Sequence, residues 1–590
     1  MKRRGSVESR IDSILLVDCG TVMTKAMLLD RVGGRYRFVA YGEVPTTLGS
    51  DPRPGVTEGV LQAVARISDV TGRRFFDSAG DIISPQVGQQ LGVDVFAATT
   101  SASEPLQMVV SGLVEDLSIA SARRAAAGTY SQIRAVLDGH GPDALADEER
   151  VRLIRDVAPD VVLIAGGIDG GAERPVLDVA KAATLACALM DREQTPTLVY
   201  AGNSRLRRQI AEIVGNEAEL RVVDNVRPTL ETEHVVGAQV ELRALFKQRK
   251  MVKLVGLNTV ARWSPVDVTP TAEAFGRLIR YLWHLGEPTR GVLGVDAGAA
   301  NTTLAAVFGD RLALTTYGGL GSAFGGESLL QEGCPCSLTG WLPAPLPQHE
   351  ARGFLVNKRM RPASIPQVDG ELWFEQALAR EALRATLDIA RPGWHPDGGQ
   401  LSKDGTPLCD TVVISGGVLT QAPRPGQSAL MVLDALQPTG VSTLVMDTYG
   451  LAPALGSVAA VKPLVAVEAL DAGAFVNLAT VVTPVGEADL GEKIVSLTVN
   501  YVDGSALEVN VSYGDLEVVP LPLGQEAVLE LHPASGFDVG LGGRGRSGSR
   551  RVSGGLAGLI IDGRGRPISL PQEPRERCER IRRWLWEVGG

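Results

Sequence analysis

Two stretches of the chain repeat one order of apolar and polar positions, and this order predicts the same local structure in both. Residues 15–30 and 294–307 each begin with a run of apolar residues that ends at an aspartate, Asp18 or Asp296. A glycine follows two positions later, then small and hydroxyl side chains, and then a second apolar run. Because apolar runs bounded by turn residues are typical of buried strands, we expect a strand–turn–strand unit at each place.

After the first unit, the pattern of apolar positions predicts further strands and a helix, and later a regular alternation of strands and helices. Residues 35–44 alternate as a third strand, and residues 57–70 have helical spacing. Further strands are expected at 93–100 and 108–115. From residue 160 to 224, apolar strands alternate with helices, which predicts a small parallel sheet.

The second unit is preceded and followed by helices, and the end of the chain is rich in strands. Helical spacing occurs at 231–248, 271–285 and 370–389. From about residue 472, short alternating runs predict a β-rich region with a hairpin at Asp503–Gly504 and a final helix. The predicted parts are a tail at 1–10, a first half at 11–150, an inserted α/β subdomain at 151–250, a second half at 251–465 and a β-rich domain with its terminal helix at 466–590.

The paired turns carry residues suited to a phosphate that is bound together with a divalent cation. An aspartate repels phosphate, so the natural partner of Asp18 or Asp296 is a cation that carries phosphate oxygens. A glycine lets the backbone approach a bulky anion closely. Lys25 would add a positive charge near a phosphoryl group that is transferred from the bound phosphate. The other candidate phosphate-binding residues of the two turns are Gly20, Thr21, Thr24, Gly298, Asn301, Thr302 and Thr303.

A third segment, residues 411–419, is a strand followed by two glycines, Gly416 and Gly417. Together with the paired turns, it resembles the ATP-binding core of the superfamily of actin, DnaK-type chaperones and sugar kinases. The resemblance implies an α/β fold of duplicated ribonuclease-H-like, actin-type ATPase domains, carrying the inserted parallel subdomain and the C-terminal β-rich domain. It also implies ATP and Mg²⁺ as cofactors, with Asp18 and Asp296 as the metal ligands.

The same resemblance assigns further roles. It places Gly416, Gly417 and the small-residue helix that contains Gly456 against adenosine. The glycine-rich segment 318–326 lies where the superfamily has a moving connection, so it is either a hinge or lid or an ordinary surface loop. Asp18, Asp296 and Lys25 would then be the catalytic residues, and Asp296 would also orient the attacking water.

A narrower resemblance covers most of the chain. Residues 96–102, 108–117, 122–126 and 560–567 are similar to the glutamate mutase accessory family called MutL or GlmL. This similarity implies an ATP-hydrolysing chaperone that reactivates an adenosylcobalamin-dependent mutase. A small-molecule kinase and an ATP-dependent amidohydrolase of the same superfamily remain alternatives. The sequence offers no obvious base for a substrate hydroxyl besides the two aspartates, which favours the ATPase.

Composition narrows the remaining choices. Apolar and charged fractions of 44% and 21% are those of a soluble globular protein, and a net charge of −10 argues against a dedicated nucleic-acid binder. No apolar run is long enough for a membrane helix, and the cysteines lack a disulfide pattern, so we expect a cytoplasmic protein. Whether it forms a homo-oligomer stays open.

Three local motifs keep a plain and a functional interpretation. The pair Cys334–Cys336 has no second pair at zinc-ligand spacing, so a loop is the default. The glycines of 166–171 lack the G-x-G-x-x-G order of a dinucleotide site, which favours packing turns or a ligand cleft. Arginines within 544–551 would bind phosphate or an acidic partner, or would form a solvated loop.

Overall fold

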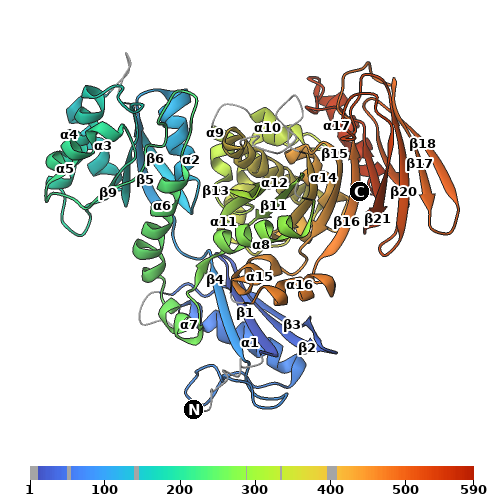
Figure 1. The fold of residues 1–590 in the computed structure, drawn as a ribbon, viewed down its shortest axis with the longest axis horizontal. Helices are drawn as coiled ribbons and strands as arrows, with labels where there is room; N and C mark the ends of the chain where they lie inside the picture. Colours follow the sequence, from blue (N-terminus) through green and yellow to red (C-terminus); the bar gives the residue numbers. More distant parts are fainter. Residues whose placement is uncertain are drawn as a thin grey trace, which may run out of the picture.

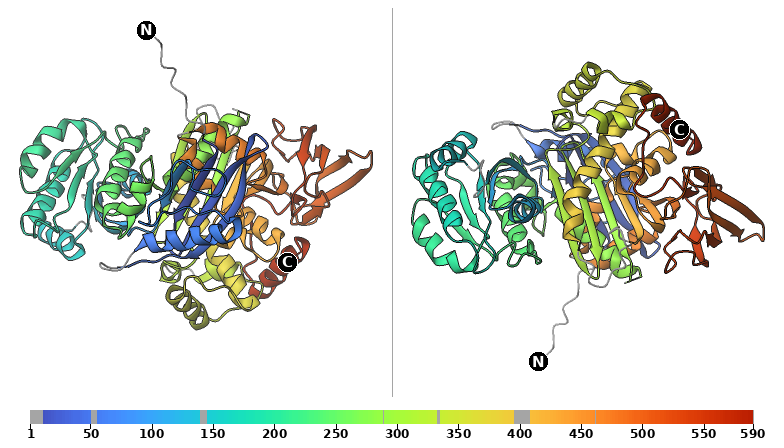
Figure 2. Two further views of the ribbon diagram at one scale, coloured as in Figure 1. Left: turned by 90° about the horizontal axis from the view of Figure 1, so that it is seen from below. Right: turned by 90° about the horizontal axis from the view of Figure 1, so that it is seen from above.

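Two sheets with matching strand order form the centre of the molecule, and two further sheets lie on either side of it (Figure 1). Figure 2 shows these outer sheets at opposite ends of the molecule. The computed structural model describes residues 11–49, 55–138, 145–287, 289–331, 335–394, 408–460 and 462–589. The predicted tail and the side chains of Cys334 and Cys336 lie outside the described part of the chain.

The first half is a five-stranded sheet with the order β10-β4-β1-β2-β3. β1 and β2 form an antiparallel hairpin, and Gly33 and Gly34, both at positive φ, turn β2 into β3. Helix α1 (Val56–Thr71) covers one face with a buried apolar stripe that includes Val60 and Val64. The strands are β1 (Ser13–Cys19), β2 (Met23–Val32), β3 (Arg35–Pro45), β4 (Val95–Thr100) and β10 (Thr269–Pro270).

Counted from its other edge, the first sheet has the order β3-β2-β1-β4-β10, and the second half repeats this arrangement as β13-β12-β11-β14-β15. β11 pairs antiparallel with β12 and parallel with β14, as β1 pairs with β2 and β4. Gly309 and Asp310 turn β12 into β13 at positive φ, where the first half uses two glycines. The duplication confirms the predicted actin-type fold. The strands are β11 (Gly291–Ala297), β12 (Asn301–Phe308), β13 (Arg311–Gly318), β14 (Cys409–Ser415) and β15 (Gly440–Met446).

Helices α8 (Thr271–Leu285) and α15 (Leu451–Ala459) pack against each other between the two halves. Their apolar side chains share one core with both sheets, including Leu16 of β1 and Val307 of β12. The other helices of the second half are α9 (Gly326–Gln331), α10 (Pro335–Gly340), α11 (Gln348–Met360), α12 (Asp369–Ala390), α13 (Gly417–Thr420), α14 (Pro425–Leu436) and α16 (Pro463–Asp471).

The inserted unit is a parallel sheet with the order β6-β5-β7-β8-β9. α2 and α6 cover one face and α3, α4 and α5 the other. β5, α2 and β6 fall within the predicted first half, 11–150, but they belong to this unit. The reason is that the chain leaves the first sheet after β4 and returns to it at β10. The elements are β5 (Leu106–Gly112), α2 (Ala120–Ala126), β6 (Ser131–Asp138), α3 (Asp147–Val157), β7 (Val161–Ile164), α4 (Arg174–Ala188), β8 (Thr197–Tyr200), α5 (Arg207–Val214), β9 (Leu220–Val222) and α6 (Val236–Arg249), followed by α7 (Leu257–Trp263).

The β-rich region is only partly a separate sheet. As predicted, the antiparallel strands β18-β17-β20-β21 form a sheet of their own, but β16, β22 and β19 extend the second-half sheet beyond β15. Leu497 and Leu529 of the separate sheet share a core with Val482 of the extension and Val441 of β15, so the two sheets pack against each other. The elements are β16 (Val476–Thr483), β17 (Lys493–Tyr501), β18 (Ala506–Ser512), β19 (Leu516–Val519), β20 (Glu526–Pro533), β21 (Gly548–Ser553), β22 (Leu559–Asp562) and α17 (Pro574–Glu587).

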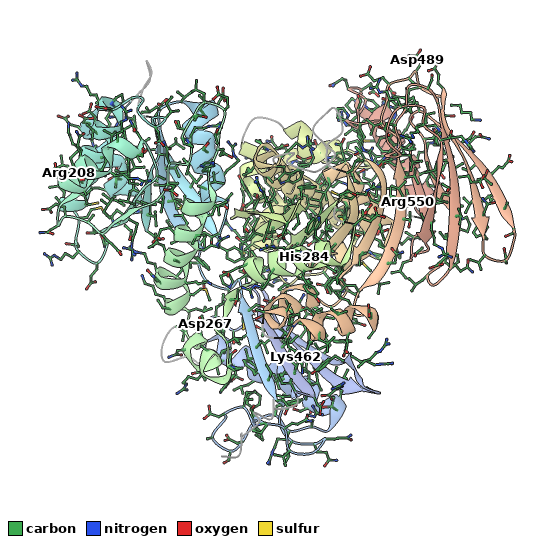
Figure 3. All side chains as sticks on the ribbon, in the orientation of Figure 1. Arg208, Asp267, His284, Lys462, Asp489 and Arg550 are labelled. Carbon is green, nitrogen blue, oxygen red and sulfur yellow. The ribbon has the colours of Figure 1, made fainter. Side chains whose placement is uncertain are left out.

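Two charged contacts tie this region to the second half. Arg550, labelled in Figure 3, reaches from β21 to Asp410 at the start of β14, at 3.2 Å, so one arginine of the predicted basic cluster is a structural link. Deeper inside, Arg564 bonds Asp562 at 2.8 Å and Asp434 of α14 at 2.7 Å. In the described part of the chain, no helix is both long and apolar enough to cross a membrane.

Candidate functional site

The two predicted turns have the same hydrogen-bonded geometry. The amide of Gly20 donates to the carbonyl of Met23, and the amide of Gly298 donates to the carbonyl of Asn301, each at 3.0 Å. A Cβ would lie 2.7 Å from the Met23 oxygen at position 20 and 3.0 Å from the Asn301 oxygen at position 298. The first turn therefore has no room for a side chain at the glycine and the second has little, which explains why a glycine stands at the same position in both.

Strand register arranges polar residues in a row across each sheet. In the first sheet, Asp18 pairs with Thr99 of β4 on one side and with Lys25 of β2 on the other, and Lys25 pairs with Glu43 of β3. Directly paired residues point to the same face of a sheet. The second sheet repeats the row with Ser415, Asp296, Thr303 and Thr316.

Asp18 is a buried carboxylate that is held by two hydroxyl groups. Thr99 Oγ1 donates to it at 2.6 Å, and Thr271 Oγ1, at the start of α8, donates at 2.7 Å. Burial raises the pKa of Asp18 above its ordinary value, although both hydroxyls and the charge of Lys25 oppose the rise. A second positive charge beside this carboxylate would therefore be stabilising.

Asp296 occupies the equivalent position in the second half. Burial raises its pKa to about 7; the charge of Lys25 lowers the value, and the charges of Asp18 and Asp447 raise it. Among the described residues, the structure records no hydrogen bond to its carboxylate. The predicted pair Asp18 and Asp296 is thus brought together, since the charge of Asp18 acts on the pKa of Asp296.

Asp447, which the sequence analysis gave no role, is the third carboxylate of the site. It follows β15 directly and accepts hydrogen bonds from the amides of Leu451 and Ala452, at 2.7 and 2.8 Å, and from Ser415 Oγ at 3.1 Å. Burial raises its pKa, while these donors and Lys25 lower it. The available signal was an aspartate at the end of an apolar strand, the same signal that marked the other two.

Lys25 is the positive group among these carboxylates. It lies on β2 of the first half, and its Nζ would be 2.7 Å from a Cβ at Gly450, which precedes α15 of the second half. Its charge lowers the pKa of all three aspartates. Lys25 therefore reaches across the joint between the halves, as a residue near the transferred group would have to do.

The turn residues with hydroxyl and amide side chains have partners inside the protein. Thr21 Oγ1 donates to the carbonyl of Ser101, and Thr302 Oγ1 donates to that of Leu320, each at 3.0 Å. Asn301 Oδ1 accepts from the amide of Gly319 at 3.3 Å, and Thr303 Oγ1 lies 3.4 Å from Thr316 Oγ1. Thus Thr21 and Asn301, both half-buried, border the site, whereas Thr302 is fully buried.

Two residues expected to bind cofactor instead serve packing. Thr24 is fully buried and shares a hydrogen bond of 3.0 Å with Thr46, because alternation along β2 turns it to the face opposite Lys25. Gly456 lies at the crossing of α15 and α8, where a Cβ would be 1.9 Å from the carbonyl oxygen of Ala274. The structure therefore corrects both assignments.

The Gly416–Gly417 turn follows β14 directly, next to the end of β11. Gly416 has a positive φ of 96°, and a Cβ there would lie 2.3 Å from the carbonyl oxygen of Ala297. Gly417 is exposed, and a Cβ there would meet nothing within 4 Å. The turn thus presents bare backbone to open space beside Asp296, as expected of a surface that receives a flat ligand.

The donor set fits Mg²⁺. Mg²⁺ is usually held by one or two carboxylates together with water and phosphate oxygens, rather than by a complete protein cage. Within the described ranges, no group of three or more His, Cys, Asp or Glu side chains forms a metal-binding cluster. Asp18 and Asp296 match the arrangement of two carboxylates completed by water and phosphate oxygens. The pKa of both is raised, and the carboxylate of Asp296 accepts no hydrogen bond from the described residues.

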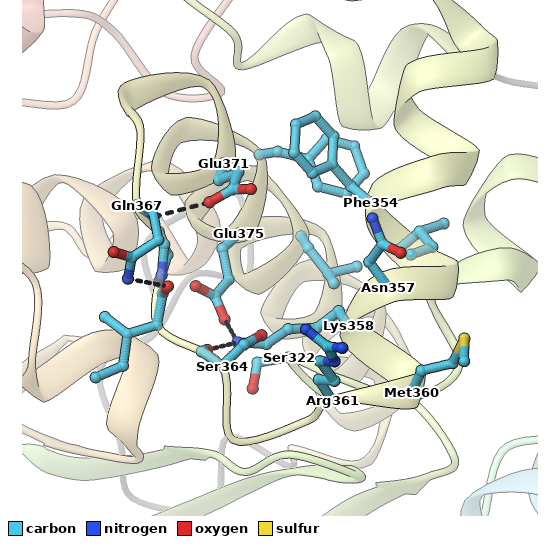
Figure 4. Close-up of a pocket in the computed structure, with 15 residues that line it drawn as sticks. Ser322, Phe354, Asn357, Lys358, Met360, Arg361, Ser364, Gln367, Glu371 and Glu375 are labelled. Atoms are coloured by element: carbon cyan, nitrogen blue, oxygen red, sulfur yellow. Dashed lines mark hydrogen bonds and ion pairs between the residues drawn. The ribbon is translucent and has the colours of Figure 1, made fainter.

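A cavity of about 400 Å³ lies between α11 and α12 and begins beside the second turn (Figure 4). Its lining includes Ser322, whose amide donates to the carbonyl of Gly298 at 2.9 Å. Lys358 pairs with Glu375 in its wall, and burial raises the pKa of Glu375 despite this lysine. Apart from charged residues on the helix predicted at 370–389, no sequence pattern indicated this cavity.

Comparison with known proteins gives a family match. The family model described as MutL protein matches residues 14–473. Protein MutL of Clostridium tetanomorphum is 25% identical over 443 residues, which cover 71% of this chain and 88% of that protein.

Solved structures are more distant. Nucleotide-free acetone carboxylase is 11% identical with a TM-score of 0.32, covering 88% of this chain and 82% of that one. The activator of 2-hydroxyisocaproyl-CoA dehydratase from Clostridium difficile with bound ADPNP is 8% identical with a TM-score of 0.28, covering 75% and 92%. Gluconate kinase from Lactobacillus acidophilus is 10% identical with a TM-score of 0.27, covering 77% and 90%.

Proposed function

Because this chain belongs to the MutL protein family, whose model matches residues 14–473, we propose that it is a Mg²⁺-dependent ATPase that acts as an accessory protein of an adenosylcobalamin-dependent mutase such as glutamate mutase. One observation carries the ATPase part. Asp18, Asp296 and Asp447 end strands of two duplicated sheets and surround Lys25 at the joint between them. This arrangement suits a metal-bound triphosphate in a cleft between two halves.

The residues of the two turns have distinct tasks in this proposal. Asp18 and Asp296 hold Mg²⁺, which when bound neutralises charge on the phosphates. The hydroxyls of Thr99 and Thr271 keep the Asp18 carboxylate oriented. Asp296, to which the described residues donate no hydrogen bond, orients the attacking water. Lys25 supplies positive charge to the transferred phosphoryl group.

The nucleoside end of ATP is assigned to the surface beyond the second turn. The bare backbone at Gly416 and Gly417 takes the adenosine, next to α13, which packs on α12. The cavity between α11 and α12 offers the stacked rings of Phe354 and Phe374 and the carboxylate of Glu375 to a base or ribose (Figure 4). The glycine-rich segment 318–326 is the candidate lid. Its residues 319–325 connect β13 with α9 and lie between the cavity and the second turn.

The accessory role rests on family membership. An ATPase of this kind uses binding and hydrolysis to change its affinity for a protein partner, since a ligand shifts a protein between states only through differential binding. In our proposal, that cycle opens a mutase, so that damaged cobalamin leaves and intact cofactor enters.

The first experiment tests the site. We expect Asp18→Asn and Asp296→Asn to abolish Mg²⁺-dependent ATP hydrolysis and to weaken Mg²⁺–ATP binding measured by calorimetry. Asp310→Asn is the matched control, because Asp310 is an exposed residue of the β12–β13 turn. Full hydrolysis in both site variants would disprove the assignment of the turns.

The second experiment tests the role. ATP turnover by the intact chain should rise when an adenosylcobalamin-dependent mutase carrying damaged cofactor is added, and should not respond to small metabolites. Stoichiometric transfer of the γ-phosphate to a metabolite, with no response to a mutase, would replace this role by that of a kinase. Truncation at residue 472 is unsuitable, since it would remove β16 and β22 from the second-half sheet.

A further inference from the structure

A second cavity, of about 650 Å³, lies between the inserted unit and the second half of the core. One wall consists of five consecutive residues of β13, Arg311 to Thr315. The facing wall comes from the start of α6 and the residues before it, and Ile389 and Ala390 at the end of α12 line a further side. Asp18, Asp296, Asp447 and Lys25 do not line this cavity, and neither do the glycines of the turns, so it is distinct from the nucleotide site.

The wall formed by β13 is the free edge of the eight-stranded sheet, and Figure 1 shows β13 on the side of the core that faces α2 and α6. The amide of Thr316 points away from β12, because it donates to the carbonyl of Ala127 at 2.6 Å. Pairing between β12 and β13 has no bulge, so every second residue has the same orientation. Leu314 and Leu312 therefore also direct their amide and carbonyl groups outward, into the cavity.

These outward groups lack a partner within the described part of the chain. No backbone hydrogen bond from the amide of Leu312 or Leu314 crosses the cavity. A strand edge with unpaired amides and carbonyls is a template for a further strand. Five residues of extended chain span about 17 Å, and this length matches the five residues of β13 that line the wall.

The remaining walls combine apolar residues with charged residues that are paired within the protein. Val235 and Val236 face β13 across the cavity, and Val236 is 64% exposed. The charge of Arg124 is taken up by Glu233, at 2.5 Å, and Ser121 donates to the same carboxylate at 2.6 Å. Asp224, a further charged residue of the lining, pairs with Arg207 at 2.9 Å. A bound segment would thus find hydrogen-bonding groups along one side, and along the other side apolar residues beside charged residues that are paired within the protein.

We propose that the free edge of β13 is a docking site for an extended, uncharged apolar segment of a partner protein, which adds a strand at Leu312 and Leu314. Strand addition satisfies alternating donors and acceptors with a backbone, and pockets for alternate side chains supply specificity. The chain already covers the same edge one step further along, where Ala127 accepts from Thr316 and Ser131 abuts Gly318. The docked segment continues this existing interface.

A segment bound here would also touch the path to the second turn. β13 leads directly into residues 319–325, where Gly319 donates to the carbonyl of Ala300 at 3.1 Å and Ala323 donates to that of Ala299 at 2.9 Å. A displacement of β13 caused by docking would therefore reach the Gly298–Asn301 turn through the backbone of residues 319–325 and its hydrogen bonds. This consequence for ATP rests on the proposed function, whereas the docking site itself does not.

The test compares two substitutions at one residue. Leu312→Pro deletes the outward amide but leaves the pairing with β12, because proline is tolerated in an edge strand where its nitrogen faces away from the ladder. Leu312→Ala removes the same side chain and keeps the amide. The probe is a fluorescent seven-residue peptide of alternating valine and threonine, and its analogue with N-methyl groups on alternate amides. We expect Leu312→Pro to bind the unmethylated peptide at least tenfold more weakly than Leu312→Ala does. We also expect the unmodified chain to bind the methylated analogue at least tenfold more weakly than the unmethylated peptide.

Four outcomes would overturn the proposal. Three concern the peptide: equal binding by the two variants, equal binding of the two peptides, and no binding of the unmethylated peptide at millimolar concentration. The fourth is self-association of the chain that Leu312→Pro abolishes, because the occupant of the edge would then be a second copy of this chain. The peptide comparison uses the unmodified chain, so it decides the matter even when Leu312→Pro fails to fold. Failure of the ATPase experiments would leave this result unaffected.

Discussion

Replacing Arg564 by methionine should destabilise the second half strongly, because this arginine is a fully buried bridge between α14 and β22. Its side chain is 0% exposed, and it donates to Asp434 at 2.7 Å and to Asp562 at 2.8 and 2.9 Å. The guanidinium also lies 4.7 Å from the ring centre of Trp584 on α17. The substitution keeps an unbranched side chain of similar length, so the main change is the loss of charge and hydrogen bonds.

The magnitude follows from what the two carboxylates retain. Removing one partner of a buried ion pair typically costs about 3–5 kcal/mol, since the other charge stays buried and uncompensated. Asp434 still bonds Arg380 and Asp562 still bonds Arg566, each at 2.7 Å. We therefore expect the lower end of the range, about 3 kcal/mol.

The loss should depend on pH in a defined direction. Burial alone would raise the pKa of Asp562, but Arg564 and Arg566 hold it well below its usual value. In the unmodified chain, this carboxylate therefore contributes stability above its unfolded pKa, which is lost only as the pH falls through the lower folded value. In Arg564→Met the pKa of Asp562 in the folded state rises, so this carboxylate is protonated at a higher pH and its buried charge is removed. The loss of unfolding free energy relative to the unmodified chain should therefore be smaller at pH 5 than at pH 7.

Unfolding in urea, followed by hydrogen exchange of the β22 and α14 segments, measures the change where it acts, because a chain of this size need not unfold in one step. Arg583→Met is the control: Arg583 pairs with Asp515 at 2.6 Å, but its side chain is 61% exposed, so we expect a change below about 0.5 kcal/mol. A loss below about 1 kcal/mol at pH 7 for Arg564→Met, or one equal to the control, would refute the reasoning.

Three further outcomes are expected. Gly456→Ala should destabilise the joint between the halves by about 1–3 kcal/mol in urea unfolding, since its Cβ would meet the carbonyl oxygen of Ala274 at 1.9 Å; an unchanged midpoint would contradict the close helix packing. Without Mg²⁺ and nucleotide, stability should fall as the pH rises from about 4 to about 7 and then level off, because the pKa of Asp296 is raised to about 7; this slope should diminish in Asp296→Asn. ATP with Mg²⁺ should slow hydrogen exchange in residues 319–325 as well as in the two turns; protection of the turns alone would remove the lid.

The local sequence determined the elements and the two turns of the core. Apolar runs that end at Asp18 and Asp296 predicted strands, and the Asp-x-Gly order predicted tight turns, which leave a side chain at the glycine no room in the first turn and little in the second. The helix predicted at 271–285 is α8, with the same bounds. These features depend on neighbours along the chain, whose spacing is visible in the sequence.

Tertiary structure alone decided which strands distant in the sequence became neighbours and which face of a strand met the site. β5 joined the inserted sheet, and β16 and β22 joined the second half, because distant apolar surfaces buried one another. Thr24 and Lys25 are adjacent in sequence, yet packing of α1 on one face of β2 buried the first and left the second beside the aspartates. Asp447 entered the site because β15 pairs with β14, a contact that no local pattern specifies. Periodicity fixes an element, whereas its partners are set by burial between residues far apart in the chain.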